Sequence, residues 1–332
     1  MEIEMFRKFV KISINKIIIM LSSKMVIKVA TFEKIKGELL LFDEELLASR
    51  QKFAELEETN RTQEKELISS KYSTNHYSTE MHYLETRLKA LQELATYSSE
   101  SQILQYFLKN FDSSSSQLLC DLLVGYLFDG KRGTFVEFGA ADGITLSNSY
   151  FLEKYLGWDG LLVEPVRGWH ADLHGNRRCQ ISNNCVYGES NQRVRMLETP
   201  DKMLSTITDF RDFDMHTGER ALGIEYEVNT ISLDDLLTLH FPNQKIDFIS
   251  IDTEGTELDI LTNFNFSRFS IGFIAVEHNF NANRPLLRKL LVDAGYIQVF
   301  ERISRWDDWW VQSNLLSRFN DSDAVQGRVG NN

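Results

Sequence analysis

A short apolar segment that ends in a glycine turn constrains the fold of this chain more than any other feature. The stretch Gly133–Gly143 (GTFVEFGAADG) contains a short apolar run rich in β-formers that ends on an acid and then enters a glycine turn. The next stretch, Thr145–Leu156, predicts a helix. A strand, a glycine loop and a helix in this order form a nucleotide-sized crevice at the carboxyl end of the first strand of an open α/β sheet.

The residues of this glycine loop limit which ligand it can hold. A dinucleotide-binding loop has the pattern G-x-G-x-x-G, but Ala141 stands where the second glycine would let the backbone touch a pyrophosphate. No Gly-Lys-Ser/Thr follows, so the chain does not have a P-loop here. Glu137 and Asp142 add negative charge that would repel a diphosphate. We therefore expect a ligand without phosphate.

An acid at the end of the next predicted strand narrows the ligand further. Glu164 lies in the segment 160–165, about 20 residues past the loop, where a carboxylate accepts hydrogen bonds from ribose hydroxyls. A ligand with a ribose, an adenine and a cationic end fits these residues. S-adenosylmethionine (SAM) has these parts, with a sulfonium, an ammonium and no phosphate, and Glu137 would then face the ammonium. The alternative is an ordinary α/β turn whose acids are solvated.

Strand and helix patterns alternate along the rest of the chain. The further predicted strands are Cys179–Val186, Arg193–Leu197, Glu225–Ile231, Ile246–Ile251, Ile271–Glu277, Tyr296–Arg302 and Trp306–Gln312. The further predicted helices are Gln117–Phe128, one starting at Ser232, Leu258–Phe264 and Pro285–Ala294. Ile246–Ile251 is too apolar for a one-sided strand and is typical of a central parallel strand. The alternation predicts a doubly wound α/β sheet.

Acidic residues follow the predicted strands at the point where each strand ends. They are Glu137, Glu164, Asp252 with Glu254, and Glu277. The carboxyl ends of parallel strands share one edge of an open sheet, and ligands bind at that edge. The sequence therefore predicts a cluster of carboxylates at the ligand-binding edge.

Five segments follow one another in an order that is typical of a known family. They are Phe135–Gly143 (FVEFGAADG), Ser147–Lys154 (SNSYFLEK), Gly157–Pro165 (GWDGLLVEP), Thr230–Leu237 (TISLDDLL) and Ile246–Glu257 (IDFISIDTEGTE). With these motifs the chain resembles the FkbM family of SAM-dependent methyltransferases, and the resemblance covers residues 133–312.

This resemblance implies a fold, an activity and a set of site residues. The fold is the class I (Rossmann-like) methyltransferase fold, with a seven-stranded, mostly parallel sheet and a reversed last strand. The activity is O-methyl transfer from SAM to a hydroxyl of a sugar, a glycan or a small hydroxylated metabolite. Carried over by position, the residues expected to bind the cofactor are Glu137, Gly139, Ala140, Asp142, Gly143, Asn148, Glu164, Asn184, Cys185 and Asp252.

The resemblance also implies which part of the cofactor each of these residues would contact. The loop 137–143 would line the methionine end, and Asn148 would reach the methionine carboxylate. Glu164 would hold the ribose, while Asn184 and Cys185 would meet the edge of the adenine.

Methyl transfer to a hydroxyl needs alignment of the reactants and removal of a proton. Alignment supplies several kcal/mol, and a general base adds about 10² to 10⁴ in rate. Asp252 is the first candidate for the base because it ends the most buried predicted strand, with Glu277 beside it facing the acceptor. His278 is the alternative base, or else a hydrogen-bonded structural histidine. Asp252, Glu254 and Glu277 also offer carboxylates to Mg²⁺, although three acids are not a diagnostic metal set.

Charge and cysteine content exclude several other classes of function. The net charge of −12 and the lack of a basic patch argue against nucleic acid and other polyphosphate partners. Cys120, Cys179 and Cys185 are an odd number without a C-x-x-C pair, which disfavours a disulfide scaffold or a zinc site. A reducing compartment, the cytoplasm, follows as the expected location.

The region before the first strand divides by composition into three predicted parts. They are an apolar and basic leader (1–30), a helical coiled-coil region (31–98) and a helical linker (99–132), followed by the methyltransferase-like domain (133–315) and a disordered tail (316–332). No uncharged run in the leader is long enough to span a membrane. The coiled coil would serve oligomerisation or docking of a partner. Its alternative is a long solvated helix that folds back on the catalytic domain.

Two other functions remain open from the sequence. A nicotinamide-dependent oxidoreductase or epimerase would use a related fold, but the second glycine and a clear Tyr-x-x-x-Lys pair are missing. A non-catalytic coiled-coil scaffold could retain a nucleotide fold, although acids at each strand end argue against the loss of a site.

Overall fold

The computed structural model describes residues 72–97, 102–211, 217–242 and 245–319. The chain divides into two compact units, Met1–Glu100 and Ser101–Asn332. The predicted leader, most of the predicted coiled coil and the tail from residue 320 onward lie outside the described residues. Among the described helices, none is both long and apolar enough to cross a membrane.

The described part of the first unit is one helix, α3 (Tyr72–Tyr97), of 26 residues. It contains neither glycine nor proline, the two residues that most disfavour a helix interior. This helix is compatible with the helical region predicted for 31–98. The coiled coil itself stays a prediction, because most of that region lies outside the described residues.

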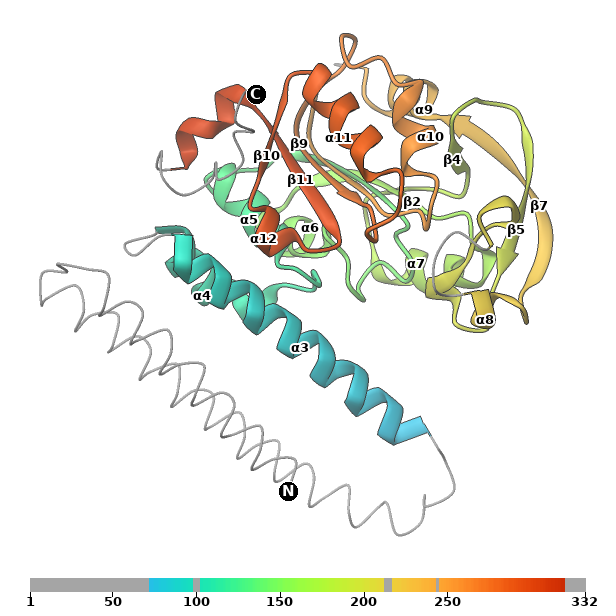
Figure 1. The fold of residues 1–332 in the computed structure, drawn as a ribbon, viewed down its shortest axis with the longest axis horizontal. Helices are drawn as coiled ribbons and strands as arrows, with labels where there is room; N and C mark the ends of the chain where they lie inside the picture. Colours follow the sequence, from blue (N-terminus) through green and yellow to red (C-terminus); the bar gives the residue numbers. More distant parts are fainter. Residues whose placement is uncertain (1–71, 98–101, 212–216, 243–244, 320–332) are drawn as a thin grey trace, which may run out of the picture. The chain divides into compact units, whose positions relative to one another are not determined.

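The second unit is built on a seven-stranded sheet with the order β10-β11-β9-β8-β1-β2-β3 (Figure 1). Its strands are β1 (Thr134–Phe138), β2 (Asp159–Val163), β3 (Gln180–Ser182), β8 (Lys245–Ile251), β9 (Ser270–Glu277), β10 (Tyr296–Val299) and β11 (Asp307–Gln312). The pairings from β3 across to β9 are parallel, whereas β11 is antiparallel to both of its neighbours. The α/β sheet with a reversed last strand, predicted above, is confirmed.

Helices cover both faces of this sheet (Figure 1). On one face lie α9 (Leu233–His240), α10 (Glu257–Thr262) and α11 (Arg284–Asp293), and on the other lie α5 (Cys120–Leu127) and α6 (Tyr150–Leu156). The other α-helices in the described part of this unit are α4 (Gln102–Asn110), α7 (His170–Asn176), α8 (Thr217–Arg220) and α12 (Glu301–Ser304). Val136, Ile249 and Ile274 from three adjacent strands pack with Leu236 and Leu287 in one buried core. Every residue of β8 after Lys245 is buried, as expected of a strand covered on both faces.

The region predicted as a helical linker is part of this same compact unit. In α5 and just before it, Leu119, Cys120 and Leu122 are fully buried. The hydroxyl of Ser116 donates a 2.5 Å hydrogen bond to the side-chain oxygen of Asn148 in the loop after β1. Residues before the first strand therefore support the loop that the sequence places at the ligand site.

A smaller four-stranded sheet has the order β4-β7-β5-β6. Its strands are β4 (Cys185–Tyr187), β5 (Arg193–Glu198), β6 (Thr206–Ile207) and β7 (Ile224–Ser232). Cys185, Met196 and Ile207 form its buried core together with Val166, which follows β2. This sheet therefore packs beside the end of β2, where Glu164 lies.

Two predicted elements begin or divide differently from the sequence pattern. The single strand predicted for Cys179–Val186 is two strands in two sheets, because Asn184 turns the chain by donating its backbone and side-chain N–H groups to the Ser182 hydroxyl. The helix predicted from Thr145 begins only at Tyr150. Polar side chains of Asp142 and Glu137 bind the backbone before it and hold that stretch as a loop.

The predicted strand Tyr296–Arg302 is also too long. β10 ends at Val299, and Phe300 takes a left-handed φ of 52° before the short helix α12. A bulky residue in this conformation is costly, so surrounding packing must impose it. Phe300 is 3% exposed, so the bend allows its ring to be buried.

The fold predicts that Gly139 tolerates no side chain. Its φ is 71°, and a Cβ there would lie 1.9 Å from the carbonyl oxygen of Asp252 in the neighbouring strand segment. Because the clash is with backbone, Gly139→Ala is expected to lower the free energy of unfolding by at least about 3 kcal/mol. Gly175→Ala is the control, since a Cβ at that helical position meets nothing within 4 Å. Urea unfolding of both variants checks this; equal stability of the two would contradict the close approach.

Candidate active site

The loop between β1 and α6 is held by its own backbone against the end of β2. The N–H groups of Gly139 and Ala140 donate to the carbonyl of Val163 at 3.1 and 3.3 Å. Gly143 has a φ of 80°, and a Cβ there would come within 2.6 Å of the Arg177 side chain. The predicted glycine loop is therefore present, and its two glycines are required by close approach as well as by conformation.

The buried carboxylate of Glu137 holds this loop through hydrogen bonds. Its carboxylate accepts hydrogen bonds from the hydroxyls of Ser147 and Ser149 and from the backbone N–H of Asn148. The guanidinium of Arg177 lies 3.9 Å away, and Glu137 is only 4% exposed. Its oxygens are thus committed to protein donors, so Glu137 shapes the loop instead of offering a free carboxylate to an ammonium group.

Asp142 and Asn148 have the same kind of supporting contacts. Asp142 accepts from the backbone N–H groups of Ile144 and Thr145 at 2.8 and 2.7 Å and so caps the turn. The Asn148 amide donates to the hydroxyl of Ser250 in β8 at 2.9 Å. Asn148 therefore ties the loop to the central strand, 102 residues away in the sequence.

Glu164 lies at the end of β2 and is 3% exposed. Its two carboxylate oxygens accept separate backbone hydrogen bonds, from Ala141 at 2.8 Å and from Val166 at 2.7 Å. An ionised carboxylate has about four acceptor positions, so two remain for ligand hydroxyls. Desolvation, with a smaller contribution from the charge of Asp252, raises the pKa of Glu164 to about 7 against the effect of these two hydrogen bonds.

The two residues predicted at the adenine edge lie at the start of the smaller sheet. Asn184 is exposed, and Cys185 is buried at 4% exposure. Desolvation raises the pKa of the Cys185 thiol to about 12, and the charge of Glu164 adds to the effect. Cys185 is therefore a neutral, apolar neighbour of the Glu164 carboxylate.

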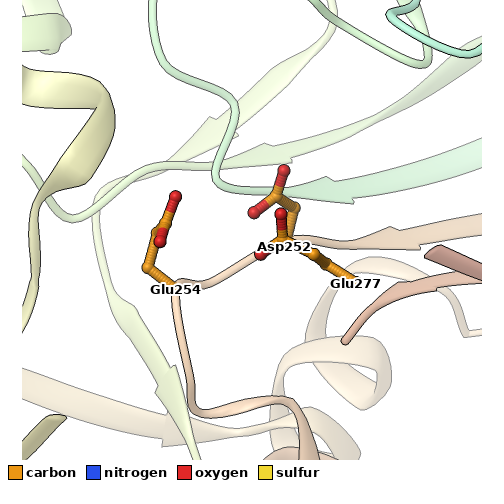
Figure 2. Close-up of side chains that lie close together, drawn as sticks. All are labelled: Asp252, Glu254 and Glu277. Carbon is orange, nitrogen blue, oxygen red and sulfur yellow. The ribbon is translucent and has the colours of Figure 1, made fainter. Parts of the chain in front are cut away.

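Three of the predicted acids form a cluster that we call the acid rim: Asp252, Glu254 and Glu277. One carboxylate oxygen from each lies within 4.8 Å of the others. Figure 2 shows Asp252 and Glu277 side by side, with Glu254 on the turn that follows β8. Asp252 is exposed and the other two are half-buried, so the rim is open to water as well as crowded by protein.

Loss of water and nearby negative charge favour the neutral forms of Asp252 and Glu277. Desolvation raises the pKa of Asp252, partly offset by a hydrogen bond with Glu277. Desolvation, together with the charges of Asp252 and Glu254, raises the pKa of Glu277 well above its ordinary value. A positive charge bound between them would reverse this effect, because an opposite charge within a few ångströms favours ionised carboxyls.

Asp307 is a fourth acid at this edge that the sequence pattern missed. It begins β11, where it pairs in register with Glu277. Desolvation and the charge of Asp252 raise its pKa well above the ordinary value. The sequence shows an acid at the start of this strand. Only the antiparallel pairing of the strand with β9 shows that this acid lies at the same edge as Glu277.

Two further contacts set the shape of the rim. Arg220, fully buried, donates to Glu254 at 3.1 Å, and the Glu254 backbone takes a φ of 57°. Glu257, the first residue of α10, accepts from the backbone N–H groups of Thr253 and Gly255. Glu257 therefore organises the turn between Asp252 and the helix and, like Glu137, is occupied by protein donors.

His278 is separated from the acid rim by its own hydrogen bonds. Its Nδ1 accepts from the backbone N–H of Phe280 at 2.9 Å, and its Nε2 lies 3.6 Å from Asp308. The residue is 1% exposed, and desolvation lowers its pKa, with Asp308 acting in the opposite direction. This geometry matches the structural histidine, because Nδ1 accepts a backbone hydrogen bond and Nε2, although it has no hydrogen-bond partner among the described residues, is buried away from an acceptor hydroxyl.

Sheet order and site together define a class of protein. If the strands of the large sheet are numbered 1 to 7 along the chain, their order in the sheet is 3-2-1-4-5-7-6, and strand 7 is reversed. A glycine loop follows strand 1 and an acid follows strand 2. This arrangement is the class I methyltransferase fold. Residues 137–297 match the family model described as "Methyltransferase FkbM domain". The chain thus carries an FkbM methyltransferase domain, and family and fold support a methyl-transfer function.

Comparison with individual proteins adds weaker likenesses. Precorrin-6y C5,15-methyltransferase from Geobacter metallireducens GS-15 is 10% identical with a TM-score of 0.35, over 60% of this chain and 90% of that one. Methyltransferase FkbM from Methylobacillus flagellatus KT is 15% identical with a TM-score of 0.34, over 68% of this chain and 58% of that one. No curated protein matches the chain. At these scores the likenesses carry no argument, and the assignment rests on the family match and the strand order.

The raised pKa of Glu164 predicts how stability depends on pH. The unfolded chain releases this proton near the ordinary value of 4.5 and the folded chain only near 7, so stability falls as pH rises between them. The difference is equivalent to about 3 kcal/mol. Urea unfolding of the wild type at pH 5.5 and 8 is expected to show the loss.

Matched variants identify the group responsible. Glu164→Gln should make the decline between these two pH values shallower, and the other acids with raised pKa values, Asp252, Glu277 and Asp307, account for the decline that remains. Glu153→Gln should retain it, because Arg177 and Arg178 overcome desolvation and lower the pKa of Glu153, which places its titration below this range. An unchanged slope in Glu164→Gln would contradict the assignment.

Proposed function

We propose that this chain is a SAM-dependent O-methyltransferase that acts on a hydroxyl of a sugar, a glycan or a small hydroxylated metabolite. The methyltransferase FkbM domain supports methyl transfer, and SAM is the donor that such a family implies. The observation that carries the proposal is the gathering of Asp252, Glu254 and Glu277 within 4.8 Å at the carboxyl edge of the sheet. A cationic donor is the ligand that relieves this concentration of negative charge.

The residues present fit SAM in three respects. Gly139 and Ala140 bring backbone close to the end of β2, and Glu164 retains acceptor positions for ribose hydroxyls. Asn184 and Cys185 follow β3 at the place proposed for the adenine edge. The acid rim begins with Asp252, whose charge is felt at Glu164, so the sulfonium end would lie toward Asp252.

The supporting residues have a different role in this proposal. Glu137, Asp142 and Asn148 bind protein groups and hold the loop in shape, as described above. They position Gly139 and Gly143 for the methionine end. Loss of their contacts is therefore expected to weaken donor binding through the loop and not through a lost ligand contact.

In the proposed mechanism the protein aligns the acceptor and removes its proton. When bound, SAM supplies a methyl group on a positively charged sulfur that leaves in an in-line displacement. Asp252 accepts the hydroxyl proton as the general base, because it is the exposed member of the rim. Glu277 holds Asp252 through their hydrogen bond, and neighbouring charge keeps Glu277 protonated to higher pH. A positioned base of this kind contributes about 10² to 10⁴ in rate.

Metal assistance and other cofactors are alternatives that one set of measurements separates. The acid rim can offer three oxygens to a divalent cation, and the comparisons give no support for one. A nicotinamide cofactor would place a diphosphate near these acids, which repel it. A scaffold that binds neither cofactor would leave the rim without a ligand.

Donor binding is expected to stabilise the protein selectively. SAM at about 100 times its dissociation constant should add about 2.7 kcal/mol to the free energy of unfolding. S-adenosylhomocysteine, which lacks the positive charge on sulfur, should add less, and NAD should add nothing. Thermal unfolding with and without EDTA measures this. Stabilisation by NAD alone would favour an oxidoreductase, and none by any of the three would favour the scaffold.

Asp252→Asn is expected to separate binding from turnover. The amide retains the shape of the side chain but cannot take the proton, so labelled methyl transfer to a panel of glycans and hydroxylated compounds should fall by about 10² to 10⁴. SAM should still stabilise the variant. Asp259→Asn, in α10 and half-buried, is the matched control and should retain activity. Full activity of Asp252→Asn would remove it from the proposed role.

A further inference from the structure

A cavity of about 410 Å³ has none of the acids of the rim in its lining. Phe280, Arg284, Glu301, Arg305 and Trp306 line it. These residues come from the segment after β9, the starts of α11 and α12, and the two residues before β11. These segments lie at the carboxyl edge of the sheet (Figure 1). Its volume is within the range of about 300–1,000 Å³ that small-molecule sites occupy.

Two aromatic side chains give this cavity an apolar wall. Phe280 is 68% exposed, which is unusual for so large an apolar side chain. Trp306 is half-buried, whereas Trp309 and Trp310 are each 1% exposed and belong to the core. Of the three tryptophans near the end of the chain, Trp306 is thus the one whose ring can contact a ligand.

The charges around the cavity leave one arginine without a counter-charge. Arg284 pairs with Asp308 at 2.7 Å and Glu301 at 3.3 Å, and Arg288 pairs with the same two acids. Within the part of the chain that the structure describes, Arg305 has no carboxylate at ion-pair distance. Arg284, Arg288 and Arg305 together carry one more charge than the two acids Asp308 and Glu301. This group is therefore positive, although the net charge of the chain is −12.

The backbone holds these residues in costly conformations. Phe280 and Arg305 in the lining have φ values of 54° and 52°, and the adjacent Asn279 and Phe300 have 41° and 52°. None of the four is glycine, and each such conformation costs on the order of 1–3 kcal/mol. Strain of this kind collects at ligand sites, where packing holds side chains in place for binding.

The cavity is joined to the acid rim through the first residues of β11. The Trp306 carbonyl accepts from the backbone N–H groups of His278 and Asn279. Asp307 follows at once and pairs with Glu277 in the rim. Consecutive Cα atoms are about 3.8 Å apart, so the backbone of Trp306 lies one residue from Asp307, which is opposite Glu277. The buried His278 thus connects two functional parts instead of acting as a base.

We propose that this cavity binds the methyl acceptor, and that the acceptor is a hydroxylated ring that carries a carboxylate or a phosphate. This inference rests on the proposed function. The ring packs on Trp306 and Phe280, and Arg305 pairs with the anionic group. The acid rim repels that same group, so the anion stays at Arg305 and a hydroxyl points toward Asp252 and Glu277. Opposite charges at the two ends thereby orient the acceptor.

Fluorine NMR of the full chain labelled with 5-fluorotryptophan tests this at one side chain. Trp306→Phe identifies the Trp306 resonance by its loss. Glucuronate, glucose 6-phosphate and glucose are then titrated to millimolar concentration. The first two separate a carboxylate from a phosphate on the same ring, and glucose tests the ring alone. We expect one or both anions to shift the Trp306 resonance and glucose not to do so.

Charge-matched variants complete the test. Arg305→Gln should weaken the anion titration about tenfold or more, which corresponds to about 1.4 kcal/mol. Arg178→Gln, an exposed arginine before β3, should leave it unchanged. Equal shifts with glucose and the anions, no shift with any of the three, or an unaltered titration in Arg305→Gln would each overturn the proposal.

Thermal unfolding with SAM keeps the two proposals apart. Arg305→Gln should still be stabilised by SAM, because Arg305 is not among the proposed donor contacts. Loss of the anion response with SAM stabilisation intact would sink only the acceptor site. Absence of SAM stabilisation in the wild type would instead sink the proposed function, whatever the fluorine titration shows.

Discussion

Repulsion among carboxylates at the edge of the sheet is the constraint around which this site is organised. Asp252, Glu254 and Glu277 bring oxygens within 4.8 Å, and Asp307 enters the same electrostatic neighbourhood. The structure offsets the repulsion unevenly. Buried Arg220 pairs with Glu254, whereas Asp252 and Glu277 share a hydrogen bond with each other. The remaining charge is what a cationic donor can stabilise.

Acidic residues that follow the same sequence pattern have two different roles in the structure. Glu137 and Glu257 each accept three hydrogen bonds from protein donors, so their charge is used to hold a turn in shape. Glu164 is intermediate, because it fastens the loop through Ala141 while keeping acceptor positions open. Asp252 is crowded by the other acids and is exposed, whereas Glu277 is crowded and half-buried. The number of donors around each carboxylate therefore separates supporting acids from reactive ones.

The proposed donor and acceptor sites use opposite charges on one edge of the sheet. The acid rim favours a sulfonium, and the cavity with Arg305 favours an anion. Antiparallel pairing of β11 with β9 brings the two sites together, since it sets Asp307 opposite Glu277 and Trp306 just beyond them. A fully parallel sheet would have placed the beginning of that strand at the opposite edge. The reversed strand is thus the structural reason why the two sites adjoin.

Local pattern was enough to predict most of the sheet. Apolar runs such as Ile246–Ile251 mark buried strands because burial on both faces requires them, and acids that follow such runs must meet at one edge of a parallel sheet. The boundaries that were wrong, at Thr145 and within Cys179–Val186, lie where polar side chains bind nearby backbone and compete with regular structure.

What only the tertiary structure decided is which of these residues are free to act. Asn148 meets Ser250 across 102 residues, and Arg220 meets Glu254 across 34. Spacing along the chain carries no trace of such pairings, because a hydrogen-bond partner is chosen by distance in space. By itself the sequence determined the sheet, its acidic edge and the expected chemistry. The fold decided that Glu137 accepts hydrogen bonds from protein donors, that His278 is buried, and that Asp307 lies opposite Glu277.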